Sequence, residues 1–273
     1  MSGDPTLYRG SAPFYSRGRL PYAPGMVEAL THAIGLDGSG RLIDVGCGPG
    51  VVALQFASAF AEVVGVDADG EMIAEATAEA KRLGVENARW FTLRAEKLPA
   101  GLGSFRVATL AQSFHWMDRE RVASTLRSML ESSGALVLVQ AYTRQDVDPI
   151  GPMPHPRPPW EEITEVVRGY LGSETRAGQG LRDWDQREHA EFLRHWFTGP
   201  TDVAVPDGRM LTRTADQVIA ALYSVSSSAP HLFGDRLAAF ETDVRQLLTD
   251  ASPAGLFSVQ TGDTGLSIWR PRT

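Results

Sequence analysis

A short run of glycines with an acidic residue on either side is the part of this sequence best suited to ligand chemistry. The run reads DVGCGPG from Asp44 to Gly50, and Asp67 follows 23 residues after Asp44. Glycines let the backbone turn sharply and let a ligand approach it closely. An acid about 20 residues later is where nucleotide-binding sheets grip ribose hydroxyls. Together these residues predict a nucleoside ligand.

The charge of this loop indicates what else the ligand carries. The glycines are spaced GxGxG instead of GxGxxG, Asp44 places a negative charge beside them, and Pro49 removes a backbone N–H donor. A diphosphate is therefore disfavoured, and a cationic group such as an amine or a sulfonium is favoured. The alternative, a glycine-rich turn without a ligand, is weakened by the spacing of Asp67.

Histidines supply the candidate bases. His115 is the leading one because it follows a predicted strand and because an unperturbed histidine side chain has a pKa near 6.5. It could instead orient its loop together with Trp116. Three others are interpreted as surface or packing residues unless the second half of the chain covers the site: His155, His189 and His195. Three tryptophans could form an aromatic pocket for a ligand, although tryptophans more often pack in a core: Trp160, Trp184 and Trp196. Cys47, inside the glycine turn, is interpreted as structural.

Composition excludes several classes of protein. The 273 residues carry a formal net charge of −7 and no basic stripe, so we expect no nucleic-acid partner. No apolar run reaches the roughly 20 residues of a membrane span, and the N-terminus lacks a secretory pattern. A single cysteine rules out an internal disulfide and a cysteine-based zinc site, and no metal-binding motif is present. We therefore expect a cytoplasmic protein without a metal or a membrane partner.

Strands and helices alternate through the first half of the chain. Strands are predicted at 42–45, 62–66, 89–93, 105–110 and 135–139. Helices are predicted at 26–34, through the face formed by Val52, Phe56 and Phe60, after the cap Asp69, and from the cap Asp118 to 130. This alternation predicts right-handed βαβ units, so the fold class is α/β with a doubly wound sheet.

The second half of the chain does not continue the alternation of strands and helices. Six prolines between 149 and 159 exclude a helix or a central strand there. Amphipathic helices are predicted at 160–170, 183–196, 216–223 and 235–248, followed by a hairpin of 256–259 with 266–269. We interpret these helices as a cap or insertion on the α/β core, and not as a separately folding domain.

These motifs, in this order, resemble the class I S-adenosylmethionine (SAM)-dependent methyltransferases. DVGCGPG is similar to the first family motif, GVDAD (65–69) to the second and RAEKLP (94–99) to the third-strand motif. AQSFHWMD (111–118) is similar to the fourth motif of a small-molecule subgroup that includes relatives of trans-aconitate methyltransferase. The resemblance is good over about 15–142, thins over 149–214 and returns faintly at the end. It implies a Rossmann-like seven-stranded sheet, mostly parallel, with an antiparallel last strand.

The resemblance also implies SAM as the cofactor and a role for each motif. Asp67 would hold the ribose hydroxyls, Glu96 would read the adenine edge, and Gln112 or Ala111 would lie near the sulfonium. Tyr15 and Arg19 would belong to an N-terminal segment that closes over SAM. The residues implied to bind SAM are Tyr15, Arg19, Asp44, Gly46, Cys47, Gly48, Asp67, Ala68, Met72, Ala95, Glu96, Ala111 and Gln112.

We divide the chain into four parts: an N-terminal strap and helix (1–40), a SAM-binding core (41–142), a proline loop and helical substrate cap with returning core elements (143–255), and a C-terminal hairpin completing the sheet (256–273). The implied reaction is methyl transfer to an oxygen or nitrogen, less readily a carbon, of a small metabolite or natural product, by a monomer or homodimer. The alternatives are a SAM-binding enzyme catalysing a cyclisation or elimination, a nicotinamide-dependent oxidoreductase, and a binding protein with an inactive pocket.

Overall fold

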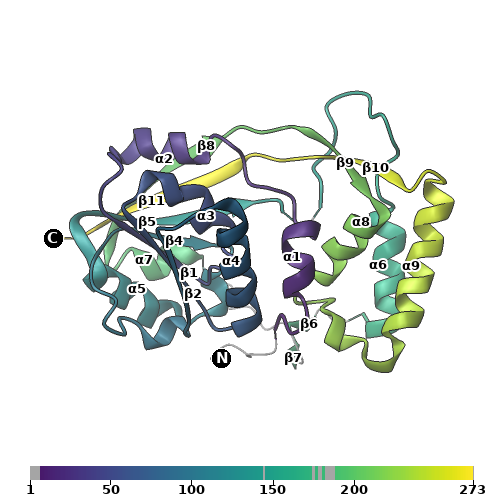
Figure 1. The fold of residues 1–273 in the computed structure, drawn as a ribbon, viewed down its shortest axis with the longest axis horizontal. Coiled ribbons are helices and arrows are strands. Elements are labelled where there is room, and N and C mark those ends of the chain that lie inside the picture. Colours follow the sequence, from purple (N-terminus) through teal and green to yellow (C-terminus); the bar gives the residue numbers. More distant parts are fainter. Residues whose placement is uncertain (1–6, 144, 174–175, 178–179, 182–187, 273) are drawn as a thin grey trace.

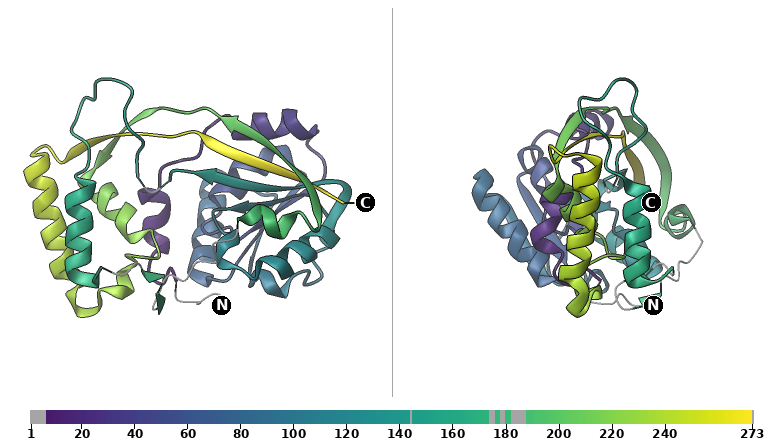
Figure 2. Two further views of the ribbon diagram at one scale, coloured as in Figure 1. Left: turned by 180° about the vertical axis from the view of Figure 1, so that it is seen from behind. Right: turned by 90° about the vertical axis from the view of Figure 1, so that its right-hand side faces the viewer.

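The alternating elements of the first half form a central sheet with helices on both faces (Figure 1). This computed structural model describes residues 7–143, 145–173, 176–177, 180–181 and 188–272. A second group of helices stands beside the sheet, and the two parts are distinct from the front and from behind (Figure 2). None of the helices within these described ranges has the length and apolar character needed to cross a membrane.

Seven strands form the sheet: β1 (Arg41–Val45), β2 (Glu62–Asp67), β3 (Ala88–Thr92), β4 (Phe105–Ala111), β5 (Leu130–Ala141), β8 (Phe197–Val205) and β11 (Thr264–Pro271). They lie in the order β3-β2-β1-β4-β5-β11-β8. The first five pair in parallel, and β11 (yellow in Figure 1) is antiparallel to both β5 and β8. The predicted sheet, mostly parallel with an antiparallel last strand, is confirmed.

Strand order reverses at β1, whose neighbours are β2 and β4. Open α/β sheets bind ligands in the crevice beyond the carboxyl ends of their strands at such a point. The glycine run follows β1 directly, so the topology places it at this crevice.

Five helices pack on the sheet: α2 (Met26–Ile34), α3 (Val51–Phe56), α4 (Gly70–Leu83), α5 (Arg119–Met129) and α7 (His189–Leu193). Asp69 caps α4 by accepting from Glu71 N at 2.8 Å, and Asp118 caps α5 by accepting from Arg121 N at 3.1 Å, as predicted. Side chains alternate between two apolar clusters, as for Ile43 on one face of β1 and Leu42 on the other. We call the sheet with these helices the sheet lobe.

The helical lobe consists of α6 (Trp160–Leu171), α8 (Ala215–Tyr223) and α9 (Leu237–Ala251). These helices pack around Tyr223 and Phe240 in a third apolar cluster, separate from the two of the sheet lobe. Helix α1 (Ala12–Gly18) lies between the lobes and packs against α8, with the rings of Phe14 and Tyr223 5.0 Å apart (Figure 1).

The predicted C-terminal hairpin is wrong. β10 (Leu256–Gln260) pairs with β9 (Met210–Thr214) in a small two-stranded sheet, whereas the following strand β11 joins the main sheet. Other backbone hydrogen bonds of β10 go to the proline segment: Ser258 N donates to Pro156 O at 3.0 Å, and Val147 N donates to Gln260 O at 3.1 Å. Partners distant in sequence therefore take the place of β11 beside β10.

Other differences lie in the second half and at the N-terminus. Of the helix expected over 183–196, the structure shows the short helix α7. Residues 183–187 lie outside the described residues, and β8 begins at Phe197. β8, β9 and α1 were not predicted: β8 is largely exposed and contains Pro200, so it lacks the apolar alternation of a buried strand. Two further strands of two residues each, β6 (Arg176–Ala177) and β7 (Gly180–Leu181), pair with one another in antiparallel orientation.

Candidate functional site

The glycine turn after β1 is held against β2 by its backbone. Gly46 N and Cys47 N both donate to Val66 O, at 2.8 and 3.1 Å. Gly46 has a φ of +69°, and a Cβ there would lie 2.6 Å from the Cβ of Ser113, so this position requires glycine. Gly48 has a φ of +53°, but a Cβ there would meet nothing within 4 Å. Its open side faces a cavity.

Asp67, at the end of β2, is oriented by this turn. Its Oδ2 accepts from Gly48 N at 2.8 Å, and its Oδ1 accepts from Asp69 N at 2.9 Å. A carboxylate oxygen can accept more than one hydrogen bond, so both oxygens can still accept from a ligand. Burial raises the pKa of this carboxyl, and the two backbone N–H groups partly oppose that rise. Asp67 is thus a fixed, half-buried pair of acceptors.

The cavity above the turn, which we call the first cavity, collects most of the residues predicted to bind SAM. Those that line it are Tyr15, Gly46, Gly48, Asp67, Ala68, Met72, Ala95, Glu96, Ala111 and Gln112. Those that do not are Arg19, Asp44 and Cys47. The candidate base His115 does not line this cavity either.

Asp44 lies in the sheet beneath the turn and does not line the cavity. It is fully buried, and its Oδ1 accepts from the hydroxyl of Thr109 on β4 at 2.8 Å. Burial raises the pKa of Asp44 to about 7. Cys47 is also buried, and burial raises the pKa of its thiol well above the ordinary value, as expected for a structural cysteine.

Arg19 reaches the first cavity only through Tyr15. Its guanidinium lies 4.8 Å from the ring centroid of Tyr15. Nη1 donates to Thr143 Oγ1 at 3.2 Å, and Nη2 donates to Ser224 O at 2.8 Å. Arg19 therefore fastens the end of α1 to the chain that follows β5 and to the end of α8.

Two aromatic residues complete the wall beside Tyr15. The ring of Tyr8 packs edge-on against both Tyr15 and Trp116, with centroids 6.4 Å apart in each case. Tyr8 was not predicted as a site residue, since nothing local in the N-terminal sequence separates it from the other tyrosines. Trp116 was considered only as a neighbour of His115.

Glu96 is distant from the glycine turn in sequence but lines the same cavity. Its Oε1 accepts from Asp118 N at 3.1 Å, and its Oε2 lies 3.5 Å from Arg94 Nε. Apolar side chains share this lining, among them Met72 and Leu93. The first cavity therefore combines two fixed carboxylates with apolar surfaces.

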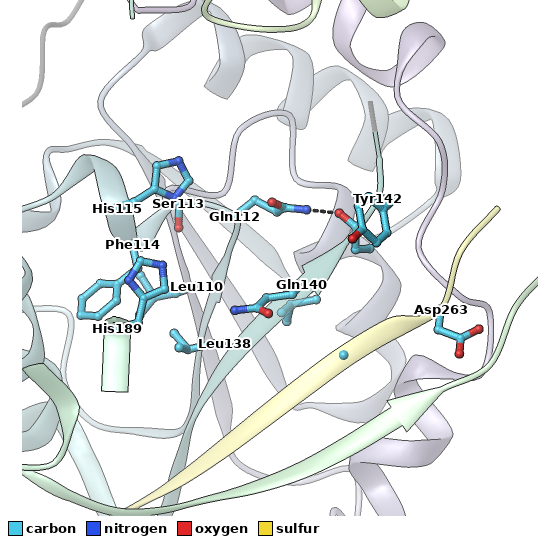
Figure 3. Close-up of a pocket in the computed structure, with 13 residues that line it drawn as sticks. Leu110, Gln112, Ser113, Phe114, His115, Leu138, Gln140, Tyr142, His189 and Asp263 are labelled. Carbon is cyan, nitrogen blue, oxygen red and sulfur yellow. Dashed lines mark hydrogen bonds between the residues drawn. The ribbon is translucent and has the colours of Figure 1, made fainter. Parts of the chain in front are cut away.

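A second cavity, of about 380 Å³, adjoins the first (Figure 3). Gln112 and Ser113 line both cavities. Gln112 has a φ of +56°, which a residue with a side chain rarely adopts, and its amide donates to Ala141 O. Strained backbone of this kind is found at functional sites, and here it lies at the boundary of the cavities.

His115 and His189 line the second cavity with apolar and amide side chains (Figure 3). His115 is thus brought next to the boundary formed by Gln112 and Ser113, as a base for an acceptor in this cavity would need. His189 was interpreted as a surface or packing residue. Its approach to His115 depends on how α7 packs on α5, which no local sequence signal reveals.

The two described members of the tryptophan trio pack against different apolar clusters, which agrees with core packing, the use preferred from the sequence, and not with a shared pocket. Trp160 packs in the helical lobe and donates from Nε1 to Asp146 at 2.7 Å, whereas Trp196 packs against the sheet lobe. Trp184 lies outside the described residues. Within the described ranges, no cluster of three or more potential metal ligands is present.

The chain is similar in sequence to known methyltransferases. Residues 42–134 match the model of a methyltransferase domain. Over 107 residues the chain is 35% identical to the uncharacterized methyltransferase YcgJ of Bacillus subtilis (39% of this chain and 42% of that protein). Over 120 residues it is 35% identical to the ubiquinone/menaquinone biosynthesis C-methyltransferase UbiE of Citrifermentans bemidjiense (40% and 49%). The chain thus spans less than half the length of these two relatives.

Solved structures are similar over a larger share of the chain at lower identity. The crystal structure of YcgJ superposes with a TM-score of 0.52 at 20% identity, covering 90% of this chain and 98% of that one. The [4+2]-cyclase SpnF superposes with a TM-score of 0.51 at 19% identity, covering 92% and 82%. These similarities concern the fold.

Proposed function

We propose that this protein is a class I SAM-dependent methyltransferase that transfers the methyl group of SAM to an oxygen or nitrogen of a small organic molecule. The match of residues 42–134 to a methyltransferase domain supports this proposal. The observation that carries this proposal is Asp67, whose two oxygens are fixed by Gly48 N and Asp69 N at the point where strand order reverses.

The lining of the first cavity fits SAM. The two oxygens of Asp67 suit the neighbouring hydroxyls of a ribose, because each can accept a further hydrogen bond. Glu96 supplies an acceptor for the adenine amino group, and Met72 offers an apolar surface to the base. When bound, SAM would supply an electrophilic methyl group on a cationic sulfur.

The residues of the chain would act mainly by positioning. Methyl transfer requires the nucleophile, the methyl carbon and the sulfur in one line, and such alignment contributes several kcal/mol. Gln112 and Ser113, which line both cavities, place the boundary between donor and acceptor at the end of β4. Tyr15 and Tyr8 line the first cavity, where they would shield a bound ligand from water. His115 is the candidate base for an acceptor that must lose a proton, such as a hydroxyl.

Two measurements test this function. Calorimetric titration should detect SAM binding, and incubation with methyl-labelled SAM and extract of the producing cells should yield a labelled product. Mass spectrometry of that product distinguishes a methyl group on oxygen, nitrogen or carbon. Absence of both SAM binding and label transfer would overturn the proposal.

The alternative is a cyclisation or elimination in which SAM is bound but not consumed. It is retained because the fold is similar to that of the [4+2]-cyclase SpnF. S-adenosylhomocysteine accumulates only if the methyl group is transferred. Turnover of an acceptor without S-adenosylhomocysteine would favour the alternative.

A further inference from the structure

We propose that His189 binds the methyl acceptor as a neutral hydrogen-bond donor, in a ring orientation set by Arg119, and so selects acceptors that carry a carbonyl, carboxylate or phenolate oxygen. His189 is then a positioning residue, distinct from the candidate base His115. The identity of the ligand rests on the proposed function, whereas the state of the imidazole does not.

The contact between Arg119 and His189 defines the proton position. Arg119 lies in the first turn of α5, His189 begins α7, and Arg119 Nη1 is 3.4 Å from His189 Nδ1. A guanidinium has five N–H donors and no acceptor. Nδ1 must therefore be the unprotonated nitrogen, and in a neutral ring the proton lies on Nε2. Nε2–H is then the polar group that His189 offers to the second cavity.

The surroundings of the ring keep it neutral. Burial and the positive charge of Arg119 both lower the pKa of His189. Arg119 itself is buried, with its guanidinium 4.0 Å from the ring centroid of Phe192. Arg119 and His115 are a charged and a titratable side chain that contact the His189 ring. A second positive charge on His189 would lie directly beside Arg119.

The ring is also held in place by its neighbours. Phe114 packs edge-on against it, with centroids 5.2 Å apart, and His115 lies parallel to it, with centroids 6.2 Å apart and planes 9° apart. His189 and His115 lie at one end of the second cavity, and Asp263 lies at the other (Figure 3). A donor held rigidly at one end recognises a lone pair. An ammonium group has none, so it would be rejected at this end.

Nitrogen NMR of the full-length, histidine-labelled protein tests the proton position without any ligand. His189, assigned by comparison with His189→Gln, should show a protonated Nε2 and an unprotonated Nδ1 at pH 7. A proton on Nδ1 in the unsubstituted protein overturns the proposal. In Arg119→Met, the two tautomers should mix and the pKa of His189 should rise. If Arg119→Met does not fold, the measurement on the unsubstituted protein decides alone.

Two aromatic probes of similar size and opposite charge test whether His189 selects a ligand that accepts a hydrogen bond. Benzoate should shift the Nε2 resonance of His189, and benzylamine, protonated at pH 7, should not. His189→Leu should weaken benzoate binding at least about tenfold, whereas His189→Gln, which keeps an N–H donor, should restore most of it. An equal response to both probes, or no response to benzoate, overturns the proposal. Calorimetry with SAM on the same samples reports separately on the proposed function.

Discussion

At the scale of single residues, Asp67 and Asp44 are two carboxyls with different surroundings, because Asp67 is half-buried and Asp44 fully buried. Asp67 has both oxygens on backbone N–H groups at the rim of the first cavity, where a ligand can reach them. Asp44 is fully buried, accepts from Thr109 and does not line the first cavity. The first therefore governs binding, and the second governs how stability depends on pH.

Replacing Asp67 tests its role in binding. Asp67→Asn should raise the dissociation constant for SAM about 10- to 100-fold, because one acceptor oxygen becomes an N–H₂ donor. Calorimetric titration measures this change. The control is Glu75→Gln on the exposed face of α4, which removes the same charge and should leave SAM binding within about twofold. Equal affinities for Asp67→Asn and the unsubstituted protein would contradict the assignment.

The raised pKa of Asp44 predicts a stability that falls with rising pH. The folded protein keeps the proton of Asp44 to about pH 7, whereas the unfolded chain loses it near pH 4, so the folded state binds more protons in between. This contribution to stability is full below about pH 4 and is lost as pH rises through 7. Asp44→Asn has no such proton. The unfolding free energy of Asp44→Asn minus that of the unsubstituted protein should therefore increase by about 1–3 kcal/mol from pH 5 to pH 8. Urea denaturation at both values checks this, and an unchanged difference refutes it.

At the scale of elements, α1 connects the first cavity to the helical lobe. Tyr15 on α1 lines the cavity, while Arg213 on β9 holds the end of α1 by donating to Arg17 O at 3.0 Å and to Arg19 O at 2.8 Å. α1 and α8 meet at Gly18, where a Cβ would lie 2.3 Å from the backbone carbon of Ala220. Backbone atoms cannot move aside as a flexible side chain can, so this crossing requires glycine.

Gly18→Ala should therefore displace α1 and loosen the wall of the first cavity. We expect a loss of about 1–3 kcal/mol in unfolding free energy and about fivefold or more in SAM affinity. Gly169→Ala in α6 is the matched control, because a Cβ there meets no atom within 4 Å, and it should be neutral or stabilise by up to about 1 kcal/mol. Denaturation and calorimetry on both variants separate the outcomes. Unchanged SAM affinity in Gly18→Ala would show that α1 does not control the cavity.

At the scale of the whole molecule, the helical lobe has its own core and meets the first cavity through α1. A ligand that orders α1 should therefore also order α8, which packs against α1, but not α9, which lies on the far side of the lobe (Figure 1). Hydrogen exchange with and without S-adenosylhomocysteine measures this. We expect slower exchange in α1, in α8 and in the glycine turn, and little change in α9. Protection confined to the sheet lobe would contradict the coupling.

Features that depend on neighbouring residues could be predicted from the sequence. The caps Asp69 and Asp118, the parallel strands and the glycine turn each depend on residues within a few positions of one another. Asp67 belongs to this group too, because strand order brings the ends of consecutive parallel strands together. Most of the other residues of the first cavity were implied by the resemblance to a methyltransferase family, motif by motif.

Contacts between distant parts of the chain were decided only by the tertiary structure. Asp44 was expected to face the ligand, but its place in β1 buries it against Thr109, 65 residues away. β10 pairs with β9 and the proline segment instead of β11, because edge hydrogen bonds are satisfied by whichever strand packing brings alongside. In the same way, packing brings His189 into the lining of the second cavity and next to Arg119, 70 residues away. Local patterns specify turns and strands, whereas packing decides which distant side chains share a cavity.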